Sequence, residues 1–370
     1  MPEQVECVVI GAGVIGLAVA RQLSQSGREV LILEREDQFG TQLSSRNSGV
    51  IHSGIYYPSH SLKASLCLQG NALLYRFCEQ RKVNYSRYGK LIVATHESQL
   101  ESLRQLQSLA SINGVKGVAW LGRDAVSDLE PEVQCIAALH CASTGVVDVY
   151  ELMLALLGDA ERAGAVLSLG SEVNKISVEN SQLEVDVVSN GAITLRAKEV
   201  VNCSGLSAQR VALTCAALSS DMVPEVFYAK GNYYSYAGKS PFQRLVYPMP
   251  NQEGLGIHAT VDLGGQLRFG PDVEWVDEVD FKVNEACSER FINSIREYWP
   301  GVNPSALTPD FASIRPKTVG PGANSGDFWV QVPADHGVAG LYNLYGIESP
   351  GLTSCMAIAE YTVQKMDKAR

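Results

Sequence analysis

The sequence lacks the long apolar run, the basic excess and the paired cysteines that would assign it to several large classes of protein. Among its 370 residues, no segment approaches the ~18 consecutive apolar residues that a membrane-spanning helix needs. The net charge of −10 argues against a nucleic-acid-binding surface, because phosphate recognition normally requires a basic face. These absences favour a globular protein. Contact with a membrane surface and a locally basic pocket for a small anion both remain open.

The nine cysteines are scattered along the chain and form no CxxC pair. An odd, dispersed set is typical of reduced thiols in a protein core, and not of a disulfide framework or a zinc site. The first residues are acidic, where a secretory signal would be basic. We therefore expect a reduced, cytoplasmic protein that binds no metal.

The composition, 46% apolar and 19% charged, is that of a chain long enough for about two domains. Short apolar runs next to helix-like segments predict a parallel α/β sheet near the N-terminus and again around residues 150–205. Residues 97–145 look like helix and loop. In residues 224–269, polar and apolar residues alternate and aromatic residues are frequent, which predicts antiparallel strands. No repeat or linker separates these patterns, so we expect two domains that interleave along the chain.

The N-terminal segment has the pattern of a dinucleotide-binding βαβ unit. A strand-like run, residues 5–10, leads into a GxGxxG turn and a helix-like segment, and the next strand-like run ends at Glu34. Such glycines let the backbone approach a pyrophosphate at the helix N-terminus, and the acidic residue accepts hydrogen bonds from ribose hydroxyls. The pattern predicts a dinucleotide with an unphosphorylated ribose. The three glycines of the turn are Gly11, Gly13 and Gly16.

The rest of the chain favours FAD over NAD. An NAD-binding domain would usually continue with further parallel βαβ units. This sequence instead has two more glycine turns far along the chain, in residues 200–208 and 345–354. Three separated turns can surround a long cofactor, and FAD needs a second cradle for its ribityl and flavin ends.

At these turns the sequence resembles the D-amino-acid-oxidase-like superfamily of FAD oxidoreductases, and more closely its L-2-hydroxyglutarate dehydrogenase/oxidase branch. The resemblance spans almost the whole chain and is carried by RNSGVIHSGIYYP at 46–58, SLKASLC at 61–67, GKLIVAT at 89–95, TGVVD at 144–148, GIHATVDLGGQLRFGPD at 256–272 and GIESPGLTS at 346–354. It implies an FAD-dependent enzyme that oxidises a small L-2-hydroxy acid at its CH–OH group, with L-2-hydroxyglutarate as the first candidate.

The resemblance also implies the fold. It is an α/β fold, α+β overall, with a Rossmann-like FAD-binding βαβ domain and an interleaved substrate domain on a large antiparallel or mixed sheet. The FAD domain would comprise residues 1–90, 145–222 and 312–370. The substrate domain would comprise residues 91–144 and 223–311, which agrees with the change in character near residue 224.

A set of residues around FAD follows from the same resemblance. Val173 would contact adenine through its backbone, and Ser204 and Gly205 would lie near the pyrophosphate. Residues 46–54 would lie against the ribityl–flavin end. Gly351 would begin a helix whose dipole stabilises the negative charge of reduced flavin at its pyrimidine edge. The other implied cofactor residues are Arg35, Ser45, Asn47, Ser48, Gly346, Leu352 and Thr353.

Hydride transfer from a 2-hydroxy acid to flavin N5 needs a cation for the substrate carboxylate and a base for the hydroxyl proton. Arg315 is the best carboxylate clamp, because its planar guanidinium binds a carboxylate bidentately. His52 is a candidate base with small neighbours that allow close approach, and His258 is a rival base or carboxylate ligand. Lys230 could pair with a second carboxylate, and Tyr56 or Tyr57 could hydrogen-bond the substrate. For each, a structural salt bridge, hydrogen bond or packing role is the plainer alternative.

Two departures from the branch leave the substrate's side chain open. The branch tends to have Arg-Gly-Glu where this chain has Lys230-Gly231-Asn232, and SIRPK at 313–317 is more similar to amino-acid-oxidising relatives. Oxidation of an amino or imino acid, as by a glycine oxidase or a D-amino-acid dehydrogenase, is therefore the alternative. A non-catalytic FAD-binding protein is less favoured. The electron acceptor, whether oxygen, a quinone or another carrier, also stays open.

Overall fold

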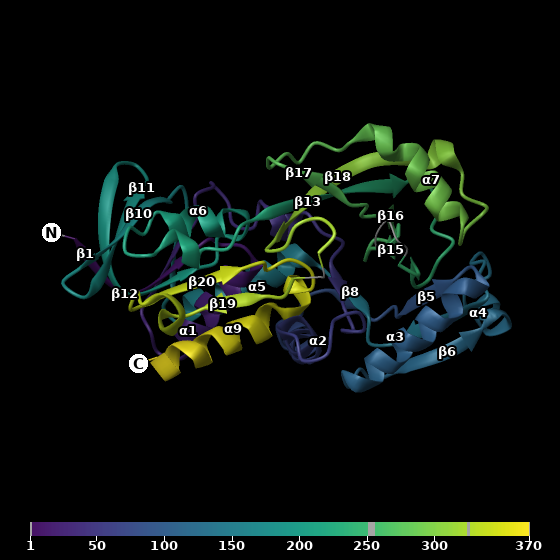
Figure 1. The fold of residues 1–370 in the computed structure, drawn as a ribbon, viewed down its shortest axis with the longest axis horizontal. Helices are drawn as coiled ribbons and strands as arrows, with labels where there is room; N and C mark the ends of the chain where they lie inside the picture. Colours follow the sequence, from purple (N-terminus) through teal and green to yellow (C-terminus); the bar gives the residue numbers. More distant parts are fainter. Residues whose placement is uncertain (1, 251–255, 324–325, 370) are drawn as a thin grey trace. The chain divides into compact units, whose positions relative to one another are not determined.

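The computed structural model describes residues 2–250, 256–323 and 326–369. They fold into two compact units, and many of their helices and strands are labelled in Figure 1. The first unit comprises Met1–Ser45, Val149–Phe227 and Arg315–Arg370, and the second comprises Arg46–Asp148 and Tyr228–Ile314. The two units interleave along the chain, as the changes in sequence character predict.

The first unit is built on an eight-stranded sheet with a parallel centre, in which β9, β2, β1, β12 and β20 run side by side. β10 and β11 join β12 in antiparallel pairs, and β19 joins β20. The last four residues of β1 are apolar and buried, as is typical of a central parallel strand. The strands are β1 (Glu3–Ile10), β2 (Val30–Leu33), β9 (Val166–Ser168), β10 (Glu172–Glu179), β11 (Gln182–Val188), β12 (Ala192–Asn202), β19 (Trp329–Gln331) and β20 (Leu341–Tyr345).

Parallel pairing aligns the carboxyl ends of the central strands in one row. Leu33 pairs with Ile10, Ile10 with Asn202, and Asn202 with Asn343. The segments that follow these residues therefore leave the sheet at the same edge. Those segments contain Glu34, the GxGxxG turn, the Ser204-Gly205 turn and Gly346.

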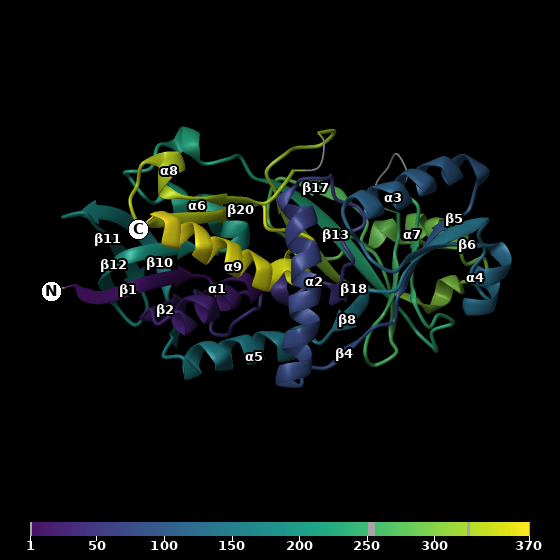
Figure 2. The same ribbon diagram turned by 90° about the horizontal axis from the view of Figure 1, so that it is seen from below.

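Helices pack on this sheet. α1 (Val14–Gln25) contacts α5 (Val149–Arg162) and α9 (Gly351–Ala369), which can be followed in Figure 2. α1 ends where Gly27 takes a left-handed φ of +88°. The remaining helical elements of the first unit are α6 (Ala208–Leu213), α8 (Pro333–His336) and the 3-10 turns η1 (Leu43–Ser45), η3 (Gly205–Ser207) and η4 (Ser220–Met222).

The second unit is built on a nine-stranded mixed sheet, which confirms the predicted large antiparallel or mixed sheet. The strand order is β17–β13–β16–β15–β14–β5–β7–β6, with β18 beside β13. β14 and β5 are parallel, whereas the neighbouring pairs on either side of them along this order are antiparallel. The strands are β5 (Lys90–Ala94), β6 (Val118–Gly122), β7 (Ala137–Cys141), β13 (Phe227–Tyr236), β14 (Leu245–Pro248), β15 (Ala259–Val261), β16 (Leu267–Phe269), β17 (Glu274–Val276) and β18 (Leu307–Lys317). Its helical elements besides α2 are α3 (Leu100–Ile112), α4 (Arg123–Leu129), α7 (Ser288–Arg296), η2 (Glu97–Gln99), η5 (Glu285–Cys287) and η6 (Pro304–Ala306).

The expectation of helix and loop for residues 97–145 was incomplete, because β6 and β7 also lie there. β7 reads AALHC and is buried at four of its five positions. A strand covered on both faces lacks the alternation of polar and apolar residues that reveals a half-exposed strand.

Residues 46–90 pack within the second unit, whereas the predicted domain bounds place them with the FAD domain. A small sheet explains this packing: β3 (Val50–Ile51) and β4 (Tyr85–Ser86) both pair with β8 (Gly145–Val147). Between them, α2 (Leu62–Arg81) is tied to the same region. The assignment of residues 46–90 to FAD binding stays a prediction.

The two longest helices are α2 with 20 residues and α9 with 19. Across the parts of the chain that the structure describes, no helix is both long and apolar enough to cross a membrane.

Candidate functional site

The GxGxxG turn joins β1 to α1, and close contacts require its glycines. Gly11 has a left-handed φ of +97°, and a Cβ there would lie 2.8 Å from the Cys203 carbonyl oxygen. A Cβ at Gly16 would lie 1.9 Å from the Gly11 carbonyl oxygen. α1 then begins after Gly13 with no acidic residue in its first turn. No side-chain carboxylate in this turn therefore neutralises the positive end of the α1 dipole, which can stabilise an anionic ligand.

Glu34 is fixed at the same edge of the sheet. Its carboxylate accepts hydrogen bonds from the backbone N–H of Ala12 at 2.7 Å and of Glu36 at 3.0 Å. A carboxylate has about four lone-pair positions, so acceptor sites remain for ribose hydroxyls. The role of Glu34 in binding the ribose stays a prediction.

The second turn packs directly against the first, since the Cβ built on Gly11 also lies 3.1 Å from Ser204 Cα. Asn202, at the end of β12, holds this turn. Its Oδ1 accepts hydrogen bonds from Ser204 Oγ at 2.6 Å and Ser204 N at 3.3 Å. Its Nδ2 donates to the Ala208 carbonyl at 2.8 Å and to Asn343 Oδ1 at 3.0 Å.

The amide chain continues across two more strands. Asn343 Nδ2 donates to Gln331 Oε1 at 3.0 Å, and Gln331 Nε2 donates to the Met222 carbonyl at 2.6 Å. The three amides, Asn202, Asn343 and Gln331, are fully buried. A backbone carbonyl can only accept, so Met222 fixes the direction of every hydrogen bond in the chain. Asn202 must consequently present its oxygen to Ser204.

The third turn follows β20 and precedes α9. Gly346 has a φ of +65°, and a Cβ there would lie 3.1 Å from Thr318 Cγ2. α9 begins at Gly351, as predicted, and Thr353 in its first turn is fully buried while Leu352 is partly exposed.

Other predicted cofactor residues have local partners. Arg35 forms an ion pair with Glu36 at 3.0 Å, and Ser45 Oγ donates to the Thr41 carbonyl at 3.0 Å. Val173 is buried in β10. Asn47 and Ser48 belong to the second unit, where Asn47 Oδ1 accepts from Gly49 N at 2.8 Å.

In the second unit, His52 follows β3 and is half-buried. Its carbonyl accepts hydrogen bonds from Asn71 Nδ2 at 2.9 Å and from Cys67 Sγ at 3.7 Å. The Tyr57 carbonyl accepts from Asn113 Nδ2 at 2.8 Å. These contacts hold the backbone of the small-residue turn on α2 and α3.

His258 lies near the start of β15 and is mostly buried. Its imidazole stacks on the Tyr247 ring, with the ring centroids 3.6 Å apart and the planes 6° from parallel. Lys90 Nζ lies 4.7 Å from the Tyr247 centroid and 4.7 Å from the Tyr56 centroid. The sequence patterns described above assign no role to Lys90, although a lysine that opens the apolar strand KLIVA is a signal of an unusual buried charge.

The two predicted carboxylate-binding cations differ in their surroundings. Lys230 Nζ is buried and lies 3.2 Å from Asp280 Oδ2, so it already has a carboxylate partner. A backbone hydrogen bond from Lys282 and then the Lys230 ammonium lower the pKa of Asp280 below its usual value. Arg315 lies in β18, in the first unit, and is partly exposed. Its side chain forms no hydrogen bond or ion pair with the residues that the structure describes.

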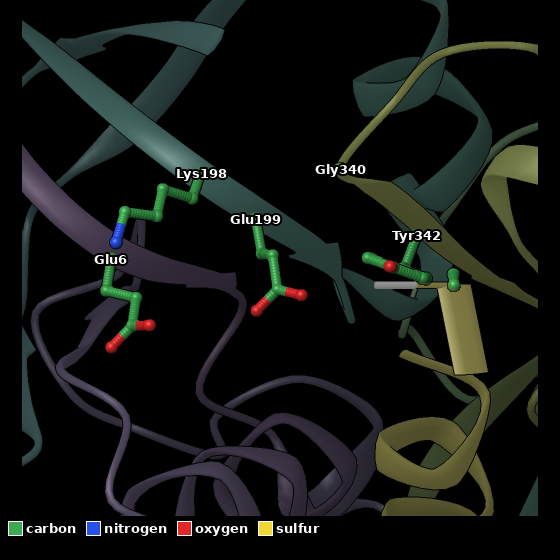
Figure 3. Close-up of a pocket in the computed structure, with 6 residues that line it drawn as sticks. Glu6, Lys198, Glu199, Gly340 and Tyr342 are labelled. Atoms are coloured by element: carbon green, nitrogen blue, oxygen red, sulfur yellow. The ribbon is translucent and has the colours of Figure 1, made fainter. Parts of the chain in front are cut away.

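A surface pocket of the first unit, drawn in Figure 3, lies away from the glycine turns. Glu6 and Glu199 come from β1 and β12 before the strand ends that carry the turns, and Glu199 lies 3.4 Å from Arg28. The pocket is lined by Glu6, Lys198, Glu199, Gly340, Tyr342 and Ala369. It offers no glycine cradle of the kind described above.

Known proteins match this chain along nearly its whole length. The FAD-dependent oxidoreductase family matches residues 6–365. A mitochondrial L-2-hydroxyglutarate dehydrogenase of Arabidopsis thaliana is 41% identical over 98% of this chain and 83% of its own length. The chain belongs to the FAD-dependent oxidoreductase family.

Solved structures of other flavin or amino-acid oxidising enzymes share the fold. The FAD-bound L-α-glycerophosphate oxidase of Mycoplasma pneumoniae superposes with a TM-score of 0.89 at 24% identity, covering 99% of this chain and 95% of the other. The glycine oxidase of Geobacillus kaustophilus superposes with a TM-score of 0.83 at 21% identity, with the same coverage.

The cofactor of this oxidoreductase is FAD, and the first unit fits it. The glycine turns provide close backbone approach, and α1 begins at the turn without a competing carboxylate. Three hydroxyls of the same unit are buried and lack a hydrogen-bond partner among the described residues: Thr41 Oγ1, Tyr345 OH and Ser354 Oγ. Buried hydroxyls without partners are costly, so polar groups of a ligand would offset that cost.

Gly16→Ala should abolish tight FAD binding, because its Cβ meets the Gly11 carbonyl oxygen and the turn must move. Strain of about 1–3 kcal/mol corresponds to a loss of affinity of roughly 10- to 100-fold. Titration of the apoprotein with FAD, followed by flavin fluorescence, measures this. Gly191→Ala is the control, since a Cβ there meets nothing within 4 Å. Equal affinities for the two variants would contradict the assignment.

Asn202→Asp should make FAD affinity depend on pH. The new carboxyl must keep its proton to donate where Nδ2 donates, so its pKa in the folded state is raised above that in the unfolded chain. Stability from such a group is present at low pH and lost as pH rises through the raised pKa. Affinity and Tm should therefore fall between about pH 5 and about pH 8, unlike the wild type. Asn202→Leu should lower the FAD affinity and the Tm at every pH. If the FAD affinity and Tm of Asn202→Asp do not change with pH, that result would argue against the fixed amide chain.

Proposed function

We propose that this enzyme oxidises L-2-hydroxyglutarate to 2-oxoglutarate. The observation that carries the proposal is the partly exposed Arg315 guanidinium without a partner among the described residues, in a chain 41% identical to an L-2-hydroxyglutarate dehydrogenase. A guanidinium in this state is ready to bind a substrate carboxylate bidentately. The alternative that Arg315 forms a structural salt bridge has no support from the described residues.

The proposed chemistry divides among a few side chains. FAD supplies the acceptor for the hydride that leaves the substrate's α-carbon. Arg315 binds the α-carboxylate, and His52 or His258 takes the hydroxyl proton, since a neutral imidazole accepts a proton near pH 7. Tyr57 donates a hydrogen bond to the substrate. The face of His258 stacks on Tyr247, so it accepts the proton at the edge of its ring.

Oxidation of an amino or imino acid is the second candidate. Its support is the SIRPK segment and the fold that the chain shares with glycine oxidase, and at 21% identity that likeness concerns the fold alone. The proposed electron acceptor is oxygen, a quinone or another carrier. We keep a cytoplasmic location with contact at a membrane surface as a proposal, while noting that the Arabidopsis relative is named mitochondrial.

Anaerobic addition of L-2-hydroxyglutarate should bleach the visible absorption of the purified flavoprotein. D-2-hydroxyglutarate should not, because its α-hydrogen would point away when the carboxylate and hydroxyl are held. Glycine, D-alanine and L-proline serve as the amine panel. Bleaching by an amine alone would favour the second candidate, and no bleaching by any compound would favour a non-catalytic FAD protein.

Arg315→Ala should raise KM for the hydroxy acid by roughly 10- to 100-fold, because a hydrogen bond to a charged group contributes about 1.5–3 kcal/mol to binding. Arg210→Ala, which removes an exposed pair with Glu172, is the control. Of His52→Ala and His258→Ala, the variant that lacks the base should lose about 10²- to 10⁴-fold in kcat. If steady-state kinetics give the same KM for Arg315→Ala as for the Arg210→Ala control, Arg315 does not bind the substrate carboxylate.

A further inference from the structure

The Lys90 ammonium in the second unit is buried without an acceptor. Lys90 opens β5, and its side chain has no solvent exposure. Nζ forms no hydrogen bond with any residue in the described ranges. An ammonium carries three donors, and buried polar groups are almost always paired. A buried ammonium needs a hydrogen-bond acceptor, and the described part of the chain does not supply one to Lys90.

The neighbours of Nζ are rings and thiols, and not carboxylates. The Tyr56 and Tyr247 rings lie at 4.7 Å each and favour a positive charge through their π faces. Burial raises the pKa of Cys67 to about 12, and it also raises the pKa of Cys141, so both thiols stay protonated. Burial correspondingly lowers the pKa of Lys90. No neighbouring described group therefore neutralises the ammonium.

The ammonium lies among the residues assigned to substrate in the second unit. The Tyr247 ring that it contacts also stacks on His258. The Tyr56 ring belongs to the residue before Tyr57, and Cys67 Sγ contacts the His52 carbonyl. Tyr247 is buried in β14, whereas Tyr56 is partly exposed and lies in a turn.

Two other lysines with buried or partly buried side chains already have carboxylate partners. Lys230 lies 3.2 Å from Asp280, and Lys317 lies 2.7 Å from Glu348. Lys230 is the residue that the sequence suggested for a second substrate carboxylate. Its partner makes it a weaker choice than Lys90, which gains its first acceptor when a carboxylate binds.

We propose that Lys90 binds the distal carboxylate of L-2-hydroxyglutarate and selects dicarboxylic over monocarboxylic hydroxy acids. The proposal rests on the proposed function, because a substrate without a second carboxylate would leave Nζ unpaired. Recognition by an otherwise unpaired buried group gives strong discrimination, since the analogue that lacks the carboxylate leaves the cation uncompensated.

The test compares two substrates on the flavin-loaded enzyme. L-2-hydroxybutyrate has the carbon skeleton of L-2-hydroxyglutarate without the distal carboxylate. Lys90→Met keeps the length of the stem and removes the charge and the donors. It should lower kcat/KM for L-2-hydroxyglutarate by roughly 10- to 100-fold and leave kcat/KM for L-2-hydroxybutyrate unchanged or higher. Lys90→Gln should act in the same direction and replaces Lys90→Met if that variant fails to fold.

Lys63→Met is the matched control, a second buried lysine of the same unit, and it should leave the ratio of the two kcat/KM values unchanged. Lys230→Met tests the rival cation. A selective loss in Lys230→Met and not in Lys90→Met would overturn the proposal, as would an equal loss for both substrates or none in Lys90→Met. If L-2-hydroxyglutarate fails to reduce the wild-type flavin, the proposed function itself fails. If it reduces the wild type but Lys90→Met shows no selective loss, only the Lys90 assignment falls.

Discussion

The parallel register of β2, β1, β12 and β20 is the constraint on which the cofactor site depends. It places Leu33, Ile10, Asn202 and Asn343 in one row, although these residues are separated by up to hundreds of positions in the chain. A shift of one residue in any pair would move a turn away from the edge and reverse the faces of its strand. The register therefore brings Glu34 and all three glycine turns to the same edge of the sheet.

That row contains two asparagines where a central strand would normally carry apolar residues. Asn202 and Asn343 are fully buried, which is tolerable because each amide has partners for its oxygen and its nitrogen. The Met222 carbonyl can only accept, so it gives the chain a single direction that ends with the Asn202 oxygen accepting from Ser204. A fully satisfied network of this kind specifies one arrangement, whereas a partly satisfied one would be worse than an apolar core. The position of the second turn is thus set by hydrogen bonds that lie beneath it.

Local signals in the sequence were sufficient for the first βαβ unit, because a glycine pattern and a terminal acid lie within one short segment. The hydrogen bond between Asn202 and Asn343 could not be predicted, since it joins residues 141 positions apart. The same limit hid the Asp280 partner of Lys230, 50 positions away. β7 was missed for a different reason, because burial on both faces removes the alternation that identifies strands. Sequence patterns report burial and turns well, but they do not report which side chains pair.

For function, it matters which cations pair with carboxylates, and sequence patterns do not report this. The chain has 40 acidic residues and 30 lysines and arginines, so carboxylates are in excess. Several buried or half-buried cations use them, as Arg28, Lys230 and Lys317 do. Arg315 and Lys90 have no such partner within the described residues, and scarcity of carboxylates does not explain it. Arg315 lies in the first unit and Lys90 in the second, and a carboxylate is the kind of ligand group that would pair either charge.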